Sequence, residues 1–290
     1  MVLKGPAAGS VFPVPVIPLD DPADARLGEY RDLKDRDLSA AGGRFVAEGE
    51  IVVRRLLGSR LRVQSILLTA PRLATLAPAI TAARAECPVF LATQPVMDAI
   101  AGFHVHRGCL AIGERGPDPE LTAGARTVLV LEDLVSADNV GACVRNGAAF
   151  GVDALVLSPR SADPFYRKAI RVALGSTFAL PIVRLRSWPA DLLALKRHLG
   201  LTLVAAVVEP PGCETETSSG SPSTPIPLPA LRRPERVGVL LGSEGPGLSA
   251  AARAACDLEV TIPMSPGADS LNVATAGALV LYHLQQVAGR

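Results

Sequence analysis

The second half of the chain carries five continuous apolar runs, at residues 127–134, 154–157, 201–208, 237–241 and 259–262. Runs of this kind are typical of parallel strands that helices cover on both faces. Segments with helical periodicity lie between or after them, at 139–150, 166–174, 191–199, 249–256 and 270–287. The alternation predicts an α/β fold built on a doubly covered parallel sheet.

The first part of the chain has a shorter and more mixed pattern. Helical segments are predicted at 23–33 and 49–57, and strands at 63–69, 89–91 and 109–112. These elements indicate a small α/β unit. Glycine, proline and alternating charge at 115–126 mark a linker, so the sequence predicts two domains, at 21–115 and 124–290.

Two segments have a composition that does not favour packed structure. Pro13, Pro15 and Pro18 interrupt an apolar stretch near the N-terminus, and we predict a flexible extension at residues 1–20. Residues 210–234 contain seven Pro, seven Ser or Thr and two Gly. A segment of that composition cannot bury enough apolar surface to pack, so we predict a disordered loop at about 210–235 inside the second domain.

The overall composition is that of a globular protein, since 49% of the 290 residues are hydrophobic and 20% are charged. There are 29 Lys and Arg against 28 Asp and Glu, a net charge of +1, so a polyanionic partner has to be sought in local clusters. The apolar runs are shorter than the ~20 residues of a membrane-spanning helix. Five cysteines without a C-x-x-C pair favour neither a disulfide framework nor a metal site, and we expect a cytoplasmic protein without a metal.

Polar residues and glycines follow three of the predicted strands, where an open parallel sheet binds its ligands. After the first strand, Asn139 opens a helix that carries Arg145 six residues later, about 9 Å along the helix axis. A glycine-rich turn at 242–247 contains Glu244, and two polar residues open the last helix. Each segment taken alone is the ordinary pattern of a helix cap or a tight turn.

Together the three segments resemble the SpoU/TrmH family of RNA 2′-O-ribose methyltransferases, within the SPOUT superfamily. The family's motifs are an Asn with an Arg six residues on and a closing Phe-Gly, a Gly-Ser-Glu-Gly loop, and Ile-Pro-Met followed by Ser-Leu-Asn-Val. The matching residues in this sequence are Asn139, Arg145, 150–151, 242–245, 262–264 and 270–273. Residues 163–181 are also similar to the family, whereas Ser136 and Ala137 stand where the common form of the motif has Asp-Pro.

The resemblance implies that the C-terminal domain is an α/β knot, a parallel sheet whose last segment is threaded through a loop to form a trefoil. It also implies S-adenosylmethionine as the methyl donor, with Gly242, Ile262 and Leu271 as the cofactor-binding residues. A glycine lets the backbone approach a nucleoside closely, and the two apolar side chains suit an adenine ring.

The resemblance assigns the reaction to five polar residues: Asn139, Arg145, Glu244, Ser270 and Asn272. A ribose hydroxyl must lose its proton as it takes up the methyl group. The family gives this role to the arginine, but a guanidinium with a pKa above ~12 is a poor base. We therefore expect Arg145 to bind the adjacent phosphate and to stabilise the developing alkoxide, while the other four side chains orient the site by hydrogen bonds.

RNA is the partner that the resemblance implies. Ribosomal RNA is favoured because residues 44–57 and the strand after them are similar to the ribosomal-protein-like substrate-binding domain of many members. Six basic residues stand against one acidic residue between 160 and 186. The candidate RNA-binding residues are Arg167, Lys168 and Arg171 in that cluster, and Arg54 and Arg55 in the first domain. The last helix is small and apolar on most sides, and the resemblance implies a homodimer that buries it.

Other functions stay open at this stage. The substrate is either ribosomal or transfer RNA, and the sequence does not decide which. A non-catalytic RNA-binding or ribosome-assembly protein of the same fold is a further alternative, although every residue of the family's site is present. A nicotinamide oxidoreductase is disfavoured because the first strand is not followed by the G-x-G-x-x-G fingerprint.

Overall fold

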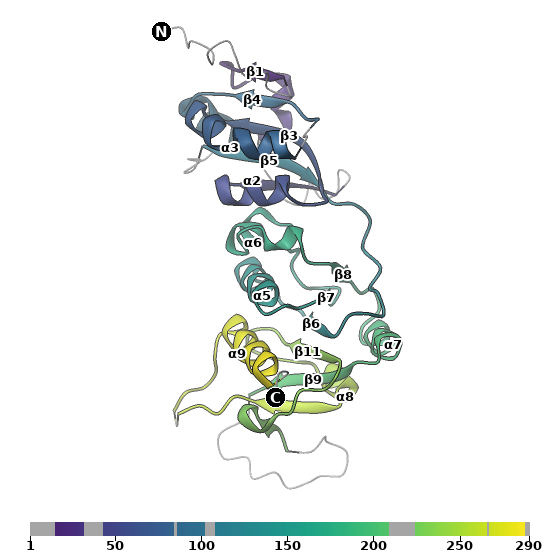
Figure 1. Cartoon of the computed structure of the whole chain (residues 1–290). Coiled ribbons are helices and arrows are strands. Elements are labelled where there is room, and N and C mark those ends of the chain that lie inside the picture. The colour runs from purple at the N-terminus through teal and green to yellow at the C-terminus, as the bar shows by residue number, and fades with distance from the viewer. Residues whose placement is uncertain are drawn as a thin grey trace. The chain divides into compact units, whose positions relative to one another are not determined.

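The structure is a computed structural model that describes residues 15–31, 43–83, 86–101, 108–208, 224–265 and 267–287. The chain divides into two compact units after Gly116, and each unit has its own sheet (Figure 1). The α/β class predicted from the apolar pattern is confirmed, and each unit is described by itself below.

The sheet of the first unit has five strands and mixed direction. Its order is β1 (Val16–Pro18), β4 (Val89–Leu91), β3 (Arg62–Leu68), β5 (Cys109–Glu114) and β2 (Arg44–Glu48). The first three strands in this order run parallel, and β5 pairs antiparallel with both of its neighbours.

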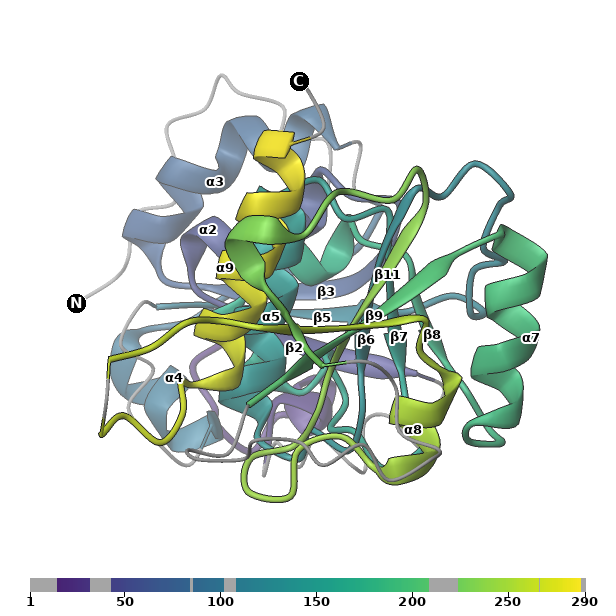
Figure 2. The same cartoon turned by 90° about the horizontal axis from the view of Figure 1, so that it is seen from below.

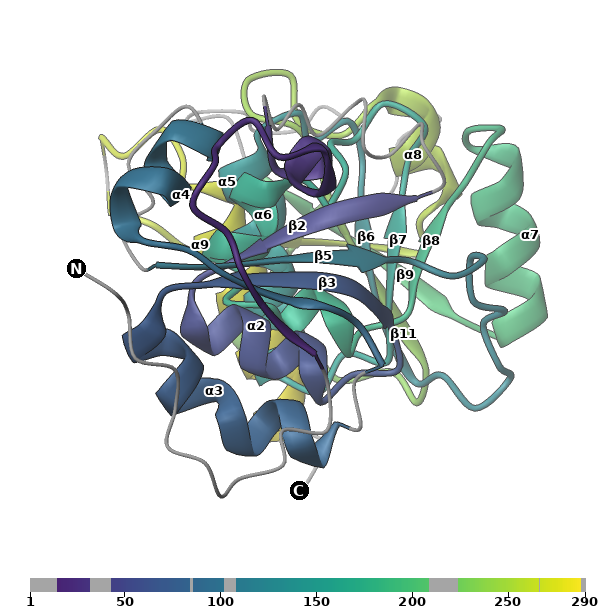
Figure 3. The ribbon, with the colours of Figure 1, turned by 90° about the horizontal axis from the view of Figure 1, so that it is seen from above.

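Helices cover both faces of this sheet (Figure 3). The 3-10 helix η1 (Ala25–Tyr30) and α4 (Gln94–Ala101) lie on one face, and α2 (Glu50–Leu57) and α3 (Ala70–Ala82) lie on the other. Tyr30 is fully buried in the core between η1 and the sheet, and its hydroxyl makes a 2.7 Å hydrogen bond with Ser65 Oγ. An aromatic body with a satisfied polar tip is what a buried tyrosine requires.

The predicted flexible extension is wrong for residues 16–19. β1 pairs in parallel with β4, and the nitrogen of Leu19 donates to Leu91 O at 2.8 Å. Leu19 itself is only 3% exposed and belongs to the core. Proline lacks an N–H group, but an edge strand such as β1 leaves one row of backbone groups unpaired, so Pro18 is tolerated there. The earlier part of the predicted extension, residues 1–14, lies outside the described residues.

The sheet of the second unit is entirely parallel, as the continuous apolar runs predicted. Its order is β10 (Ile226–Pro227), β12 (Leu258–Thr261), β9 (Thr202–Val207), β11 (Val237–Leu241), β6 (Thr127–Leu131), β7 (Ala154–Leu157) and β8 (Ile182–Arg184). Each neighbouring pair in this order is parallel.

Helices lie on both faces of this sheet as well (Figure 2). They are α5 (Ala137–Ala149) and α9 (Val273–Gln286) on one face, and α7 (Ala190–Leu199) and α8 (Ala250–Ala255) on the other. Alternate residues of β6 enter the two cores: Leu129 packs in the cluster that contains α5 and α9, and Val130 in the cluster that contains α7 and α8. A strand that is buried on both sides in this way has no polar face, which explains its continuous apolar sequence.

The predicted disordered loop is also wrong in part. Residues 224–235 are described, and β10 pairs in parallel with β12 at the edge of the sheet. The short 3-10 helix η3 (Leu228–Ala230) follows, and Leu228 and Leu231 are 7% and 2% exposed in the core. The proline-rich composition excludes a long element, but isolated leucines within it still fill gaps in the core. Residues 209–223 of the predicted loop lie outside the described residues.

Candidate active site

Three loops meet at the carboxyl edge of the parallel sheet. One joins β6 to α5, the second joins β11 to α8 and contains the glycine-rich turn, and the third joins β12 to α9. The carboxyl ends of parallel strands lie at one edge of a sheet, which is where open α/β sheets bind ligands. The three candidate motifs of the sequence fall on these three loops and on the first turns of the helices that follow.

A row of hydrogen bonds joins the three loops. Asn272 Nδ2 donates to Asn139 Oδ1 at 3.0 Å, and Asn139 Nδ2 in turn donates to Glu244 Oε1. Asn272 is also the N-cap of α9, since its Oδ1 accepts from the nitrogen of Ala274 at 3.0 Å. The cap fixes the side chain of Asn272, which fixes the amide of Asn139, and Asn139 in turn orients the carboxylate of Glu244.

A cavity of about 640 Å³ lies beside this row. That volume is in the range of about 300–1,000 Å³ that small-molecule sites occupy. The end of β9, the loop after β11 and the loop after β12 line it. Six of the eight predicted catalytic and cofactor-binding residues are among the lining residues: Gly242, Glu244, Ile262, Ser270, Leu271 and Asn272.

Gly242 allows the loop after β11 to close on itself. A Cβ atom at this position would lie 2.3 Å from the carbonyl carbon of Gly247 and 2.3 Å from the nitrogen of Leu248. Gly245 and Gly247 have φ angles of 101° and 70°, which side chains rarely adopt. The glycines of this loop are therefore required by its path, and the path brings the backbone of Gly242 to the cavity wall.

Arg145 is the predicted catalytic residue that the structure leaves apart from the others. It lies exposed on α5 and is not among the described residues that line the cavity. Six residues at about 100° each turn it roughly 120° away from Asn139 around the helix. The two motif residues therefore share a helix but face different directions, and Arg145 stays open to solvent.

The basic cluster at 160–186 carries less free positive charge than its sequence suggests. Arg160 pairs with Asp133, and this contact holds the pKa of the Asp133 carboxyl below its usual range. Lys168 pairs with Asp138, and Arg184 donates to four backbone carbonyls of the segment after β7 at 2.7 to 3.4 Å. The guanidinium of Arg184 therefore binds the backbone of this segment. The two acids that pair with Arg160 and Lys168 lie outside the basic cluster.

The other candidate RNA-binding residues differ in their exposure. In α6 (Arg167–Val172), Arg171 is exposed and Arg167 is half-buried. In the first unit Arg55 is exposed on α2, whereas Arg54 forms a 2.9 Å ion pair with Glu50. Four of the five candidates, Arg54, Arg55, Lys168 and Arg171, are thus exposed, and Arg167 is half-buried.

The sequence profile of the SpoU rRNA Methylase family matches residues 126–282, which is more than half of the chain. The chain belongs to this family. Membership makes it an RNA methyltransferase of the SpoU type, and it confirms the family suggested by the three motifs. The matched segment includes the three loops of the site, all of α5 and most of α9.

Two relatives extend the similarity beyond the matched segment. An uncharacterized tRNA/rRNA methyltransferase of Mycobacterium tuberculosis is 41% identical over 90% of this chain and 89% of its own length. RlmP of Bacillus subtilis, a 23S rRNA (guanosine(2553)-2′-O)-methyltransferase, is 29% identical over 92% of this chain and 98% of its own length. The similarity to both includes the first unit.

Among solved structures, the fold is similar to that of an AdoMet-bound rRNA methyltransferase from Sinorhizobium meliloti. The TM-score is 0.76 at 23% identity, over 93% of this chain and 98% of that chain. At this identity the comparison concerns the fold alone, which is a mixed α/β fold with parallel strands.

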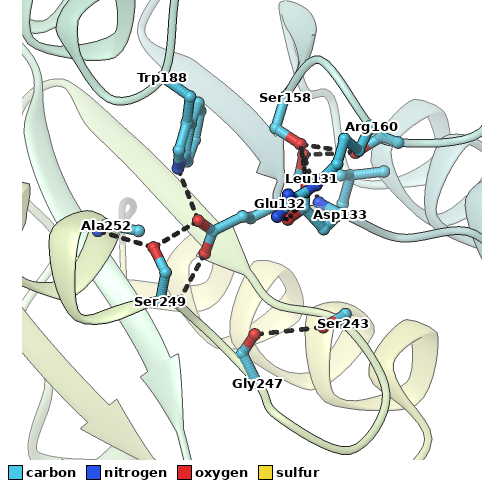
Figure 4. A network of polar contacts seen from close by, with 11 residues as sticks. Leu131, Glu132, Asp133, Ser158, Arg160, Trp188, Ser243, Gly247, Ser249 and Ala252 are labelled. Carbon is cyan, nitrogen blue, oxygen red and sulfur yellow. Dashed lines mark hydrogen bonds and ion pairs between the residues drawn. The ribbon is translucent and has the colours of Figure 1, made fainter.

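The sequence analysis missed Glu132, which follows β6 and is 2% exposed (Figure 4). Its carboxylate accepts three hydrogen bonds, from the nitrogen of Ser249 at 2.8 Å, from Ser249 Oγ at 2.6 Å and from Trp188 Nε1 at 2.6 Å. The apolar run predicted at 127–134 includes Glu132, although the strand ends one residue before it. The signal that could have revealed it is an acidic residue directly after five buried strand residues.

The described residues hold no group of three or more His, Cys, Asp or Glu side chains suited to a metal ion. Within the same residues, no helix has the length and apolar character to span a membrane. Four cysteines of the described ranges are free thiols, and Cys213 lies outside them.

Proposed function

We propose that this protein transfers a methyl group from S-adenosylmethionine to a ribose 2′-hydroxyl of ribosomal RNA. The observation that carries the proposal is the row from Asn272 through Asn139 to Glu244 beside the cavity at the carboxyl edge of the sheet. The choice of ribosomal RNA is supported by the relatives whose names state a reaction, because RlmP and others act on ribose 2′-oxygens of 23S rRNA. Transfer RNA is the second candidate substrate.

The volume and the lining residues of the cavity suit the cofactor. Gly242 lets the loop backbone form one wall, and Ile262 and Leu271 supply apolar surface for an adenine ring. Arg253 is the one cation among the described lining residues, and its guanidinium is paired with both carboxylate oxygens of Glu259 at 2.7 Å. The carboxylates of Glu244 and Asp269 line the same space and suit the ammonium group of S-adenosylmethionine. When bound, this cofactor supplies a methyl group on a positively charged sulfur, which an oxygen nucleophile attacks.

The protein's part in the reaction is to place the ribose hydroxyl and to stabilise the oxygen as it loses its proton. The carboxylate of Glu244, oriented by Asn139, accepts a hydrogen bond from the ribose hydroxyl of the RNA at the mouth of the cavity. Ser270 lines the same cavity and offers a further hydrogen bond. Arg145 is exposed on α5, so its guanidinium is available to the phosphate next to the reacting ribose.

The proposal includes a homodimer through α9. One side of α9 packs on the core, where Gly277, Val280 and Leu284 are buried. On the outer side, Leu279 and Tyr282 are 40% and 52% exposed and lie three residues apart on one helix face. A second copy of the chain that covers these two side chains removes the apolar surface from water.

The proposal also includes the trefoil knot and an RNA-binding role for the first unit. The knot is what membership of the SpoU family implies, and it concerns the last segment of the chain, where α9 packs against α5. The RNA-binding role is supported by the exposed Arg55 and by the similarity of the first unit to rRNA methyltransferases. We expect the enzyme in the cytoplasm with its RNA substrate.

The test is transfer of a labelled methyl group from S-adenosylmethionine to ribosomal RNA by the purified full-length protein. Methylation of a 2′-oxygen removes the nucleophile of alkaline RNA cleavage, so the label is expected in an alkali-resistant dinucleotide. Label released as a methylated base would contradict the proposed acceptor atom. RNA binding without any transfer of label would instead favour the non-catalytic alternative.

A further inference from the structure

Glu132 makes hydrogen bonds at both ends of the loop that carries Gly242 and Glu244, and Figure 4 shows the bonds of its carboxylate to Ser249. Its backbone nitrogen donates to the oxygen of Leu241 at 2.9 Å, directly before the loop begins. Its carboxylate accepts from the nitrogen and from the Oγ of Ser249, directly after the loop ends. Glu132, directly after β6, therefore joins the two ends of a loop of seven residues, 242–248.

Between these two ends the loop has two further contacts, the hydrogen bond from Asn139 to Glu244 and the packing of Leu248 against the core beside α8. Residues 244–247 are exposed, and the internal contacts of the loop join Ser243 to Gly247, where the nitrogen of Gly247 donates to Ser243 O at 3.1 Å. Every residue from 242 to 248 lines the cavity. The positions of the two ends therefore decide where the cavity wall lies and where Glu244 meets Asn139.

We propose that Glu132 is a positioning residue for the loop of residues 242–248, and that it acts on this loop through Ser249. The proposal rests on the proposed function, since it takes the cavity as the site of S-adenosylmethionine. A carboxylate suits the position because all three groups that face it are donors, and an ionised carboxyl only accepts. Ser249 Oγ itself accepts from the nitrogen of Ala252, which leaves its own hydrogen for Glu132.

The alternative is that Glu132 only stabilises the fold. The same carboxylate also accepts from Trp188 Nε1, which lies before α7 and outside the loop. This bond provides a matched control, because Trp188→Phe removes it and leaves both bonds to Ser249 in place. If the role of Glu132 is purely structural, loss of its bonds to Ser249 and loss of its bond from Trp188 should change the affinity for the cofactor equally.

Glu132→Gln breaks the loop side of the network selectively. The amide oxygen replaces Oε1 and keeps the bonds from Trp188 and Ser249 Oγ, so the new NH2 group faces the nitrogen of Ser249. Two donors then oppose each other, and the backbone N–H that ends the loop loses its acceptor. The substitution changes neither the size of the side chain nor any residue of the cavity wall.

The test compares the two variants and the wild type as full-length proteins, with and without ligand. Titration calorimetry with S-adenosylhomocysteine should give Glu132→Gln a Kd raised about tenfold, the effect of losing one hydrogen bond to a charged group. Trp188→Phe should stay within about twofold of the wild type. Hydrogen exchange without ligand should be faster at the amides of residues 243–249 in Glu132→Gln, and unchanged there in Trp188→Phe.

Unchanged loop exchange in Glu132→Gln would overturn the positioning role, and so would an equal loss of affinity in both variants. Should Glu132→Gln fail to fold, Ser249→Ala removes the Oγ donor to Glu132 together with the N-cap bond from Ala252, and it should raise both the Kd and the loop exchange. Wild-type values of both quantities in Ser249→Ala would also overturn the role. A wild type that binds no S-adenosylhomocysteine, while Glu132→Gln still loosens the loop, would overturn the proposed function and leave the hold of Glu132 on the loop intact.

Discussion

Replacing Gly242 by alanine tests whether the closed path of the glycine loop is needed for the reaction. The added Cβ would lie 2.3 Å from backbone atoms of Gly247 and Leu248, and ordinary contact begins at 3.4 Å. These atoms would have to move by about 3.4 − 2.3 = 1.1 Å. No side chain can rotate away to relieve the contact, so the loop itself must shift. A displacement of about 1 Å in a catalytic site costs on the order of 10²-fold in rate.

We therefore expect Gly242→Ala to lower kcat/KM for S-adenosylmethionine by about 10²-fold and to lower stability by about 1–3 kcal/mol, the usual cost of overpacking. Methyl transfer to RNA, calorimetry with S-adenosylhomocysteine and thermal unfolding measure these effects. Gly124→Ala is the matched control, because its Cβ would meet only Thr122 Oγ1 at 3.7 Å. Wild-type affinity and transfer in Gly242→Ala would refute the argument that this loop forms the cofactor wall.

Three further predictions concern other parts of the second unit. Arg145→Ala should reduce the rate of single-turnover methyl transfer by about 10² to 10⁴-fold and change the free energy of unfolding by less than about 0.5 kcal/mol. Arg145→Lys should restore little of the rate, since an ammonium lacks the planar fork that binds phosphate. Near wild-type rates in either variant would exclude a role of Arg145 in the reaction. Tyr282→Glu should convert a dimer to a monomer in sedimentation, because it places a charge on the exposed apolar face of α9, and an unchanged mass would place the interface elsewhere. Burial raises the pKa of Cys143 to about 12, so iodoacetamide at neutral pH should modify this cysteine only after unfolding, as mapped by peptide mass spectrometry. Rapid labelling of Cys143 in the native protein would contradict its burial.

The central strands could be predicted from the sequence, and the edge strands could not. β6, β11 and β9 are buried on both faces, and their continuous apolar runs show it directly. β1 and β10 are two or three residues long and contain proline, which argues against a strand unless the strand lies at an edge. Which strand lies at an edge depends on the whole sheet, and a local pattern does not contain that information.

The residues of the site could be named from their motifs, but their contacts could not. Asn272 and Asn139 are 133 positions apart in the chain, and only the return of α9 to α5 brings them together. Arg145 and Asn139 are six positions apart, and the turn of one helix separates them. A local count of charges also overestimated the free positive charge of residues 160–186. Arg160 and Lys168 of this cluster pair with Asp133 and Asp138, which lie outside it in the sequence.

The measurement that tests the central claim most directly is a map of ribose 2′-O-methylation across all RNA of a strain that lacks the gene, compared with its parent. Methylation is expected to be lost at one position of ribosomal RNA in the deletion strain. The wild-type gene is expected to restore that methyl group, and the Arg145→Ala variant is not. Complete methylation of ribosomal RNA in the deletion strain, or a loss confined to transfer RNA or to a methylated base, would contradict the proposed function.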